Sequence, residues 1–331
     1  MKKYIISKWN LAGINITYRC LNKCRHCIYE ASPKRKEVME KKDVDKVVKF
    51  LKKQELTISS LHIGGGEPLL YPDLCLYVAK RLKEETLFLD FVETSFHTNL
   101  DEDELFDVID ELFNLGMQRL VVSYTPFHLE WMSLDRLEYF IYKCYKRYGV
   151  WKITVWVPGF SRKIYQILDD NLYLDWNKFE NFLSEDYYDL IDYVDENDFP
   201  LSIIGRAAFS LDKFYYKYSA EKFKNDHCAY ELLNAKHGHV GPKGEVTLNF
   251  CSHLIVGTVE DFYNDFSVEV PENSIFSILV SKGPYALYQY AKKLGFSERE
   301  FATKCHLCSK LSKFLKKKLK IDHFEYYRYE I

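Results

Sequence analysis

The chain of 331 residues lacks the features that would place it in a membrane or on a nucleic acid. No stretch approaches the ~18 consecutive apolar residues of a membrane-spanning helix. The basic N-terminal start is followed by an apolar run that is too short for a secretory signal. The formal net charge of −2 predicts no bulk attraction to nucleic acid or to an anionic membrane. We therefore expect a cytoplasmic protein with neither partner.

The sequence also lacks internal repeats and low-complexity linkers, and it alternates strand-like with helix-like segments instead. The predicted strands are 14–17, 59–63, 87–94, 119–123, 152–157 and 201–204. The predicted helices are 41–53, 72–83, one that Asp101 opens, 131–148, and two within 168–197. This alternation predicts an α/β fold with a parallel sheet. After residue 210 the strand–helix alternation ends, and the sequence predicts a hairpin at 239–250 and a helix at 274–294. We therefore expect two domains, at 1–210 and 211–331.

Nine cysteines in a chain without a signal sequence indicate metal-binding or catalytic thiols rather than a disulfide framework. Cys20, Cys24 and Cys27 cluster directly after the first predicted strand. Iron–sulfur clusters normally take four thiolates, so a cubane held by three leaves one iron open to a small molecule. The alternative is a zinc site completed by His26 or by a distant cysteine.

The second predicted strand ends in the run Gly64-Gly65-Gly66-Glu67-Pro68. A plain turn or a phosphate loop would also use glycines here, but the run lacks both Gly-Lys-Ser/Thr and GxGxxG. In this order, the cysteine triplet and the glycine run resemble the radical S-adenosylmethionine (SAM) superfamily. The resemblance implies a [4Fe–4S] cluster on Cys20, Cys24 and Cys27, with SAM at its open iron. It also implies a partial (β/α)6 TIM-like barrel over about residues 10–210, with its site at the carboxyl ends of the strands.

The same resemblance implies a set of SAM contacts, although it identifies no catalytic residue. They are His26, Gly65, Gly66, Glu67, Asn99, Ser123, Arg136 and Arg206. Asn99 lies in Thr98-Asn99-Leu100, where many relatives have Thr-Asn-Gly after the third strand. Ser123 and Arg136 match a pair that holds the SAM carboxylate, and a solvated helix face explains Arg136 equally well.

A second cysteine set, Cys228, Cys251, Cys305 and Cys308, is large enough to close a cubane. It resembles the C-terminal auxiliary domain of radical SAM enzymes in its short "twitch" form, because the longer SPASM form needs about seven cysteines. The expected second domain is therefore a small α+β domain with an auxiliary [4Fe–4S] cluster. A four-cysteine zinc site is the alternative. We expect Cys75 and Cys144, which fall in predicted helices, to be buried structural thiols.

The layout as a whole most resembles the epipeptide-type peptide epimerases of this superfamily. The resemblance implies a 5′-deoxyadenosyl radical that abstracts hydrogen from a peptide, and an electron donor of the flavodoxin or ferredoxin type. Those epimerases carry adjacent cysteines where this chain has Cys251-Ser252, so cross-linking or oxidation fits the chain better than epimerisation. The alternatives are a radical SAM dehydrogenase or rearrangement enzyme acting on a small metabolite, and a non-catalytic iron–sulfur or zinc protein.

Overall fold

The computed structural model describes residues 1–53, 60–156, 164–185, 202–249 and 251–331, and the chain forms two compact units. The sheet unit contains residues 14–41 and 60–202. The C-terminal unit contains residues 1–13, 42–59 and 203–331. The C-terminal unit thus takes in two segments from the N-terminal part of the chain. The expected domain boundary at residue 210 stays a prediction.

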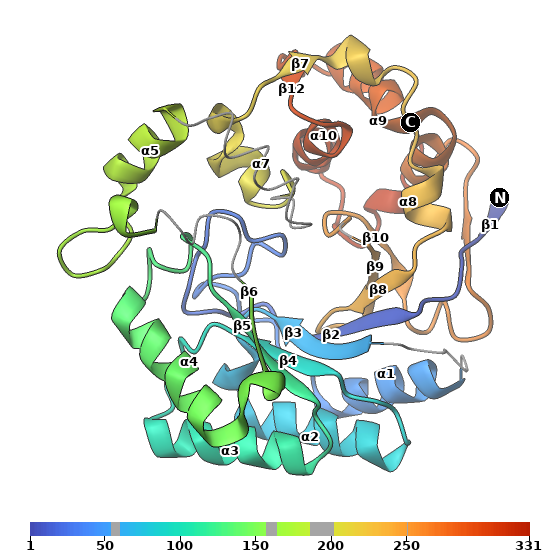
Figure 1. The fold of residues 1–331 in the computed structure, drawn as a ribbon. Coiled ribbons are helices and arrows are strands. Elements are labelled where there is room, and N and C mark those ends of the chain that lie inside the picture. The colour runs from blue at the N-terminus through green and yellow to red at the C-terminus, as the bar shows by residue number, and fades with distance from the viewer. Residues whose placement is uncertain (54–59, 157–163, 186–201, 250) are drawn as a thin grey trace. The chain divides into compact units, whose positions relative to one another are not determined.

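The sheet unit is built on parallel strands in the order β2-β3-β4-β5-β6 (Figure 1). The strands are β2 (Leu11–Thr17), β3 (Ser60–Gly65), β4 (Phe91–Thr94), β5 (Arg119–Ser123) and β6 (Ile153–Trp156). The helices are α2 (Pro72–Glu84), α3 (Glu102–Asn114), α4 (Leu134–Tyr148) and α5 (Trp176–Glu185). The structure therefore confirms an α/β fold with a mostly parallel central sheet. The partial barrel stays a prediction.

The two faces of this sheet differ in chemistry. Ile63, Val92 and Leu120 share one register position on β3, β4 and β5, and all three are buried. Figure 1 shows α2 and α3 along one side of these strands. Both helices are amphipathic, and α3 begins with the predicted cap, in which Asp101 and Glu104 form a capping box. One residue along from the apolar row, the side chains point to the other face, where Glu93 lies opposite Val121.

One predicted strand of the barrel is wrong within the described residues. Residues 202–204 form no strand, although Ile203 and Ile204 are buried. Gly205 then turns the chain at φ +53° into the short helix α7 (Ala207–Ser210). An apolar run of this length does not distinguish a strand from another buried segment. Leu201, with which the predicted strand begins, lies outside the described residues.

The C-terminal unit combines pairs of antiparallel strands with two long helices. Its strands are β1 (Lys2–Ile5), β7 (Tyr218–Ser219), β8 (His237–Val240), β9 (Glu245–Leu248), β10 (Ile255–Thr258), β11 (Ser267–Val270) and β12 (Glu300–Phe301). Its helices are α1 (Lys41–Lys53), α7, α8 (Ala229–Leu233), α9 (Ile275–Lys293) and α10 (Lys304–Leu319). The predicted hairpin is confirmed as β8 and β9, while Phe250 lies outside the described residues.

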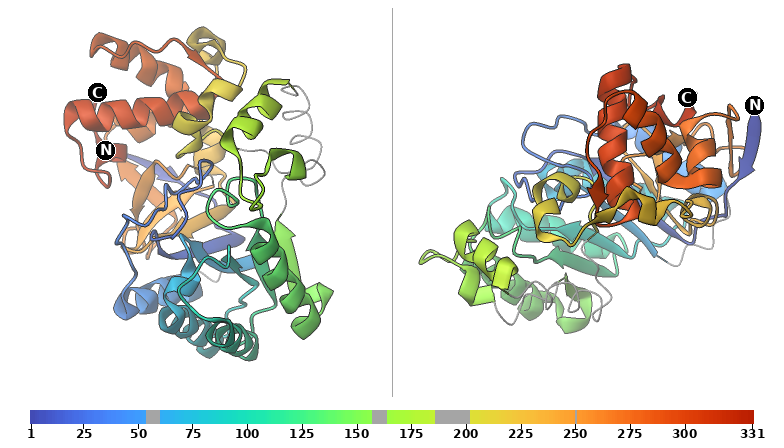
Figure 2. Two further views of the ribbon diagram at one scale, coloured as in Figure 1. Left: turned by 90° about the vertical axis from the view of Figure 1, so that its left-hand side faces the viewer. Right: turned by 90° about the horizontal axis from the view of Figure 1, so that it is seen from above.

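The core of this unit is aromatic and aliphatic. Trp9, Phe50 and Phe266 pack on one another with ring centroids 5.3–5.9 Å apart. Helices α9 and α10 pack side by side (Figure 2). In the described part of the chain, no helix has both the length and the apolar character needed to cross a membrane.

Candidate functional site

The loop that carries Cys20, Cys24 and Cys27 leaves the sheet at the end of β2, where the glycine run of β3 holds it. The backbone N–H of Gly66 donates to the Thr17 carbonyl at 2.7 Å, and that of Glu67 donates to the Arg19 carbonyl at 2.9 Å. A Cβ on Gly66 would lie 2.1 Å from the Arg19 oxygen. A Cβ on Gly65, whose φ is +117°, would lie 2.4 Å from the Thr17 oxygen. Only glycine therefore allows the two backbones to approach so closely.

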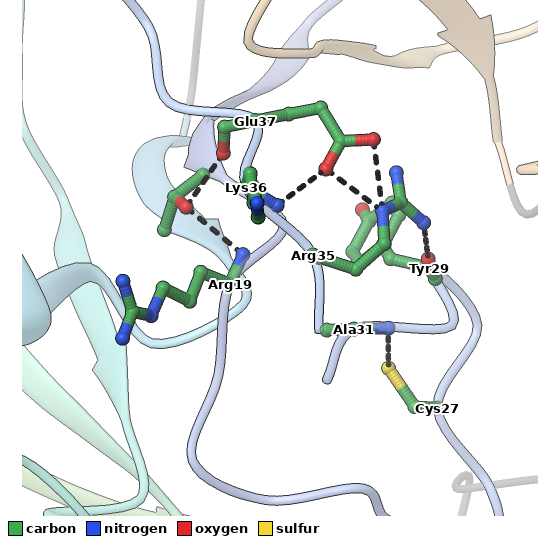
Figure 3. Close-up of polar contacts among 8 residues, drawn as sticks. Arg19, Cys27, Tyr29, Ala31, Arg35, Lys36 and Glu37 are labelled. Atoms are coloured by element: carbon green, nitrogen blue, oxygen red, sulfur yellow. Dashed lines mark hydrogen bonds and ion pairs between the residues drawn. The ribbon is translucent and has the colours of Figure 1, made fainter. Parts of the chain in front are cut away.

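The far end of the cysteine loop folds back onto its start (Figure 3). The Thr17 hydroxyl donates to the Glu37 carbonyl at 2.8 Å and accepts from the Arg19 N–H at 2.9 Å. Arg35 Nε lies 2.9 Å from both carboxylate oxygens of Glu37, and Arg35 also donates to the Tyr29 carbonyl. Because the Arg35–Glu37 pair is partly exposed, we expect it to stabilise the loop by less than ~1 kcal/mol. The backbone contacts are the main constraint.

The environment of the sulfur atoms suits thiolate ligands. The N–H of Asn22 donates to Cys20 Sγ, and the N–H of Ala31 donates to Cys27 Sγ, both at 3.3 Å. Cys20 and Cys24 are buried, while Cys27 is partly exposed. Backbone donors to cysteine sulfur stabilise the charged form and are among the contacts that tune an iron–sulfur cluster. The residues present therefore fit the cluster that the triplet predicts.

Asn22 ties the cysteine loop to the segment that follows β4. Its Nδ2 donates to Ser95 Oγ at 3.2 Å, and its Oδ1 is hydrogen-bonded to His97 Nδ1. Burial lowers the pKa of His97, and the charge of Arg136 lowers it further. A neutral His97 can donate to the Asn22 oxygen without bringing a charge next to the cysteines. The sequence reasoning did not identify this contact, because neither residue belongs to a recognised motif.

Two further side chains of the loop pack on the segments beyond β5. His26 stacks on Phe127 with ring centroids 4.9 Å apart and an interplanar angle of 28°. The Arg25 guanidinium bonds to Glu130 at 3.2 Å and lies 3.7 Å from the ring centroid of Trp176 in α5. One face of His26 is thus occupied by Phe127, and its predicted contact with SAM stays a prediction.

Glu67 connects the ends of β3 and β4. One carboxylate oxygen accepts from Thr94 Oγ1 at 2.8 Å and from the Leu69 N–H at 3.2 Å. The other accepts from the N–H and the hydroxyl of Ser95, both at 2.9 Å. The side chain is 1 % exposed, and burial raises its pKa to about 7 although these hydrogen bonds lower it. Both carboxylate oxygens thus accept hydrogen bonds from the protein itself. The predicted SAM contact of the side chain stays a prediction.

The end of β4 carries Thr94-Ser95-Phe96, four residues before the expected Thr98-Asn99-Leu100. Phe96 has φ +58°, in the left-handed region that glycine favours. In its backbone conformation and its distance from the strand end, Phe96 therefore corresponds to the glycine of Thr-Asn-Gly better than Leu100 does. Asn99 is exposed. The signal available in the sequence was the position of Thr94-Ser95 immediately after the strand.

The remaining predicted SAM contacts lie on three separate segments of the chain. Ser123 donates to the Glu93 carboxylate at 2.6 Å. Arg136 is exposed near the start of α4, with its guanidinium 5.8 Å from the Phe140 ring centroid. Arg206 belongs to the C-terminal unit and precedes α7. The SAM contacts of Ser123, Arg136 and Arg206 all stay predictions.

The structure brings the second cysteine set together inside the C-terminal unit. Cys228 precedes α8, Cys251 follows β9, and α10 carries Cys305 and Cys308. Burial raises the pKa of all four thiols, to about 12 for Cys228, and charges on neighbouring members of the set raise it further for Cys228, Cys251 and Cys308. Thiols that disfavour one another's ionisation need a nearby cation to become thiolates together. The set therefore fits a metal or an iron–sulfur cluster.

Polar side chains surround this second set. His253 Nε2 lies 3.4 Å from Cys308 Sγ. Lys304 donates to Glu231 at 2.5 Å and to the His227 carbonyl at 3.1 Å, and its charge lowers the pKa of Cys305. Such neighbours orient and tune metal-binding thiolates. The donor set suits iron–sulfur and zinc alike, so the auxiliary cluster stays a prediction.

A three-cysteine loop at the strand ends of a mostly parallel α/β sheet is the arrangement to compare with known proteins. Residues 14–137 match the model of the radical SAM superfamily. This part of the chain is thus similar to the radical SAM superfamily, a family that implies a [4Fe–4S] cluster and SAM. All three cysteines of the first set and the glycine run lie within the matched residues.

Solved structures with similar chains were also found. BtrN in complex with AdoMet and 2-DOIA is 15% identical, with a TM-score of 0.46, over 92% of this chain and 93% of that one. SuiB of Streptococcus suis bound to S-adenosylmethionine is 12% identical, with a TM-score of 0.35, over 73% and 60%. The enzyme anSMEcpe with AdoMet and the Cp18Cys peptide is 12% identical, with a TM-score of 0.34, over 94% and 99%. No curated protein matches the chain.

We predict that Gly66→Ala destabilises the sheet unit and that Gly64→Ala does not. The Gly66 methyl would meet a backbone oxygen at 2.1 Å, whereas the nearest atoms to a Gly64 methyl lie at 3.7 Å. Overpacking of this kind costs ~1–3 kcal/mol. Denaturant unfolding of the two metal-free variants beside the parent chain measures the difference. Equal stability of the two variants would show that the glycine run does not hold the cysteine loop.

Proposed function

We propose that this chain is a radical SAM enzyme in which Cys20, Cys24 and Cys27 hold a [4Fe–4S] cluster. When bound, the cluster and SAM together supply a 5′-deoxyadenosyl radical that abstracts hydrogen from an unactivated carbon. The main support is the cysteine loop itself. Backbone hydrogen bonds hold it to the glycine run, and backbone N–H groups donate to two of its sulfur atoms. The family match over residues 14–137 supports the same reading.

In this proposal the side chains around the loop position and shield the cofactors. Gly65 and Gly66 present backbone atoms, with no side chain, to the SAM amino group. Glu67 keeps Thr94 and Ser95 at the same edge of the sheet, where Ser95 is a better placed SAM contact than the exposed Asn99. His26 and Phe127 exclude water from one side of the loop.

We further propose that the substrate is a ribosomal peptide and that the reaction is an oxidation or a cross-link. Epimerisation needs a thiol that returns a hydrogen atom, and Ser252 stands where the relatives have the second cysteine. Cys75 in α2 and Cys144 in α4 are both fully buried on packed helices, which argues against either as that donor. A second cluster at the C-terminal cysteines would then accept the second electron.

A reducing cytoplasm suits this set of free thiols. Because the first electron must come from outside the chain, we propose a flavodoxin- or ferredoxin-type donor as the redox partner.

Replacing Cys20, Cys24 and Cys27 by Ala should remove about half of the iron, since two cubanes hold about eight irons per chain. It should also abolish the cleavage of SAM to 5′-deoxyadenosine. Iron analysis and chromatography of the products after anaerobic reconstitution measure both effects. Cys75→Ala is the matched control, because it removes a buried thiol and should leave the iron content unchanged. Cleavage of SAM by the triple variant would refute the proposed function.

Cys305→Ala should lower the iron content by about four per chain while it spares SAM cleavage at least in part, because the two cysteine sets hold separate clusters. It should also destabilise the C-terminal unit, since ligand binding there is coupled to folding. Metal analysis of the variant beside the parent chain decides between the two metals. A loss of zinc at constant iron would remove the electron acceptor from the proposal.

A further inference from the structure

The side chain of His253 reaches one of the four cysteines of the second set. His253 lies in the turn between β9 and β10, which the Leu254 N–H closes on the Cys251 carbonyl at 3.0 Å. Its Nε2 lies 3.4 Å from Sγ of Cys308 on α10. Helix α10 also contacts the backbone of this turn, because Lys316 Nζ donates to the His253 carbonyl at 3.5 Å. The imidazole is thus held beside the sulfur by contacts at its ring and at its backbone.

The surroundings of the ring determine which nitrogen carries the proton. Nδ1 of His253 is buried and has no hydrogen-bond partner in the described part of the chain. A proton on Nδ1 would therefore be a buried donor without an acceptor, and a neutral ring of that kind would also turn the lone pair of Nε2 toward the sulfur. A proton on Nε2 gives an N–H that donates to Cys308 Sγ instead. The contacts therefore favour the tautomer with its proton on Nε2.

An N–H donor on a cysteine sulfur changes the electron affinity of the group that the cysteine holds. Reduction adds a negative charge that the sulfur ligands share, and an N–H that donates to sulfur stabilises this charge. Hydrogen bonds to the sulfur atoms are accordingly among the factors that set the reduction potential of an iron–sulfur cluster. Cys308 is buried, so water competes little with the donor and the low local dielectric strengthens the bond.

We propose that His253 is a positioning residue whose Nε2–H donates to Cys308 and raises the reduction potential of the cluster held by the second cysteine set. The inference rests on the proposed function, in which this cluster accepts the second electron. That step takes one electron from the substrate radical, whose proton leaves to solvent, and lowers the cluster charge from 2+ to 1+. A higher potential makes this electron transfer more favourable.

The test measures the midpoint potential of the second cluster in a chain that has Ala at the three cysteines of the first set. After anaerobic reconstitution, this parent chain holds a cluster at the second set alone. A redox titration followed by electron paramagnetic resonance gives the potential. Iron content and circular dichroism establish that each variant of the parent chain assembles as the parent does.

Three variants separate the hydrogen bond from packing. His253→Leu removes the donor, and His253→Gln replaces it by an amide N–H of similar reach. His227→Leu is the matched control, because it removes an exposed imidazole directly beside Cys228. Nδ1 of His227 accepts from the Ala229 N–H at 3.4 Å, so this ring has a backbone partner in place of a sulfur atom.

His253→Leu should make reduction of the cluster about tenfold less favourable, which lowers the midpoint potential of a one-electron couple by about 59 mV. His253→Gln should keep most of the parent potential, and His227→Leu should keep all of it. If His253→Leu takes up no iron, His253→Asn takes its place, because its shorter amide does not reach the sulfur. The same fall in potential is expected for His253→Asn.

An unchanged potential in the variant without the donor would overturn the inference. An equal fall in that variant and in His253→Gln would overturn it too, because packing rather than a hydrogen bond would then be responsible. The uptake of zinc and no iron by the second set would have the same consequence. The titration needs neither SAM nor the first cluster, so its failure leaves the three-cysteine proposal intact, and a failure of SAM cleavage leaves the titration valid.

Discussion

The close approach of two backbones is the constraint on which the candidate site depends. At Gly65 and Gly66 the end of β3 comes within hydrogen-bond distance of the chain leaving β2, and any Cβ there would collide with a carbonyl oxygen. This contact determines where the cysteine loop begins. The fold-back at Glu37 then determines where the loop ends. Between these two anchors, the backbone N–H groups of Asn22 and Ala31 are aimed at sulfur atoms.

Two carboxyl groups lie near the strand ends, Glu67 buried and Glu93 partly exposed, and their surroundings differ. Glu67 accepts four hydrogen bonds from three residues and serves as a brace between β3 and β4. Glu93, the residue before Thr94 on β4, accepts a hydrogen bond from Ser123. The difference matters because the four hydrogen bonds of the buried Glu67 fix the strand ends, whereas Glu93 is partly exposed and makes a single one.

The sequence predicted well whatever depends on local pattern. The helix at 41–53 and the strand at 119–123 were predicted to the residue, because their periodicity and ends are marked within the segment. The cap at Asp101 was equally local. The cysteine triplet and the glycine run were found as motifs, and the family match covers both. The structure adds that Gly65 and Gly66 are required by packing against the cysteine loop.

The features that the sequence did not reveal depend on contacts between distant residues. Nothing in the run Phe91–Thr94 distinguishes Glu93 from an exposed strand residue, and only the bond from Ser123 on β5 shows its place. The Thr-Asn-Gly position was assigned to residues 98–100 on residue type, whereas backbone conformation favours residues 94–96. The expected strand at 201–204 was wrong because a short apolar run does not specify strand pairing.

The central claim is that the three-cysteine loop holds a cluster with one iron open to SAM. The most direct measurement is the electron paramagnetic resonance spectrum of the reduced, reconstituted Cys305→Ala chain, in which only the first cluster remains. The account predicts a [4Fe–4S]⁺ signal whose g values shift when SAM is added, because SAM binds the open iron. A spectrum that SAM leaves unchanged, in a protein that SAM saturates by equilibrium dialysis, would contradict it.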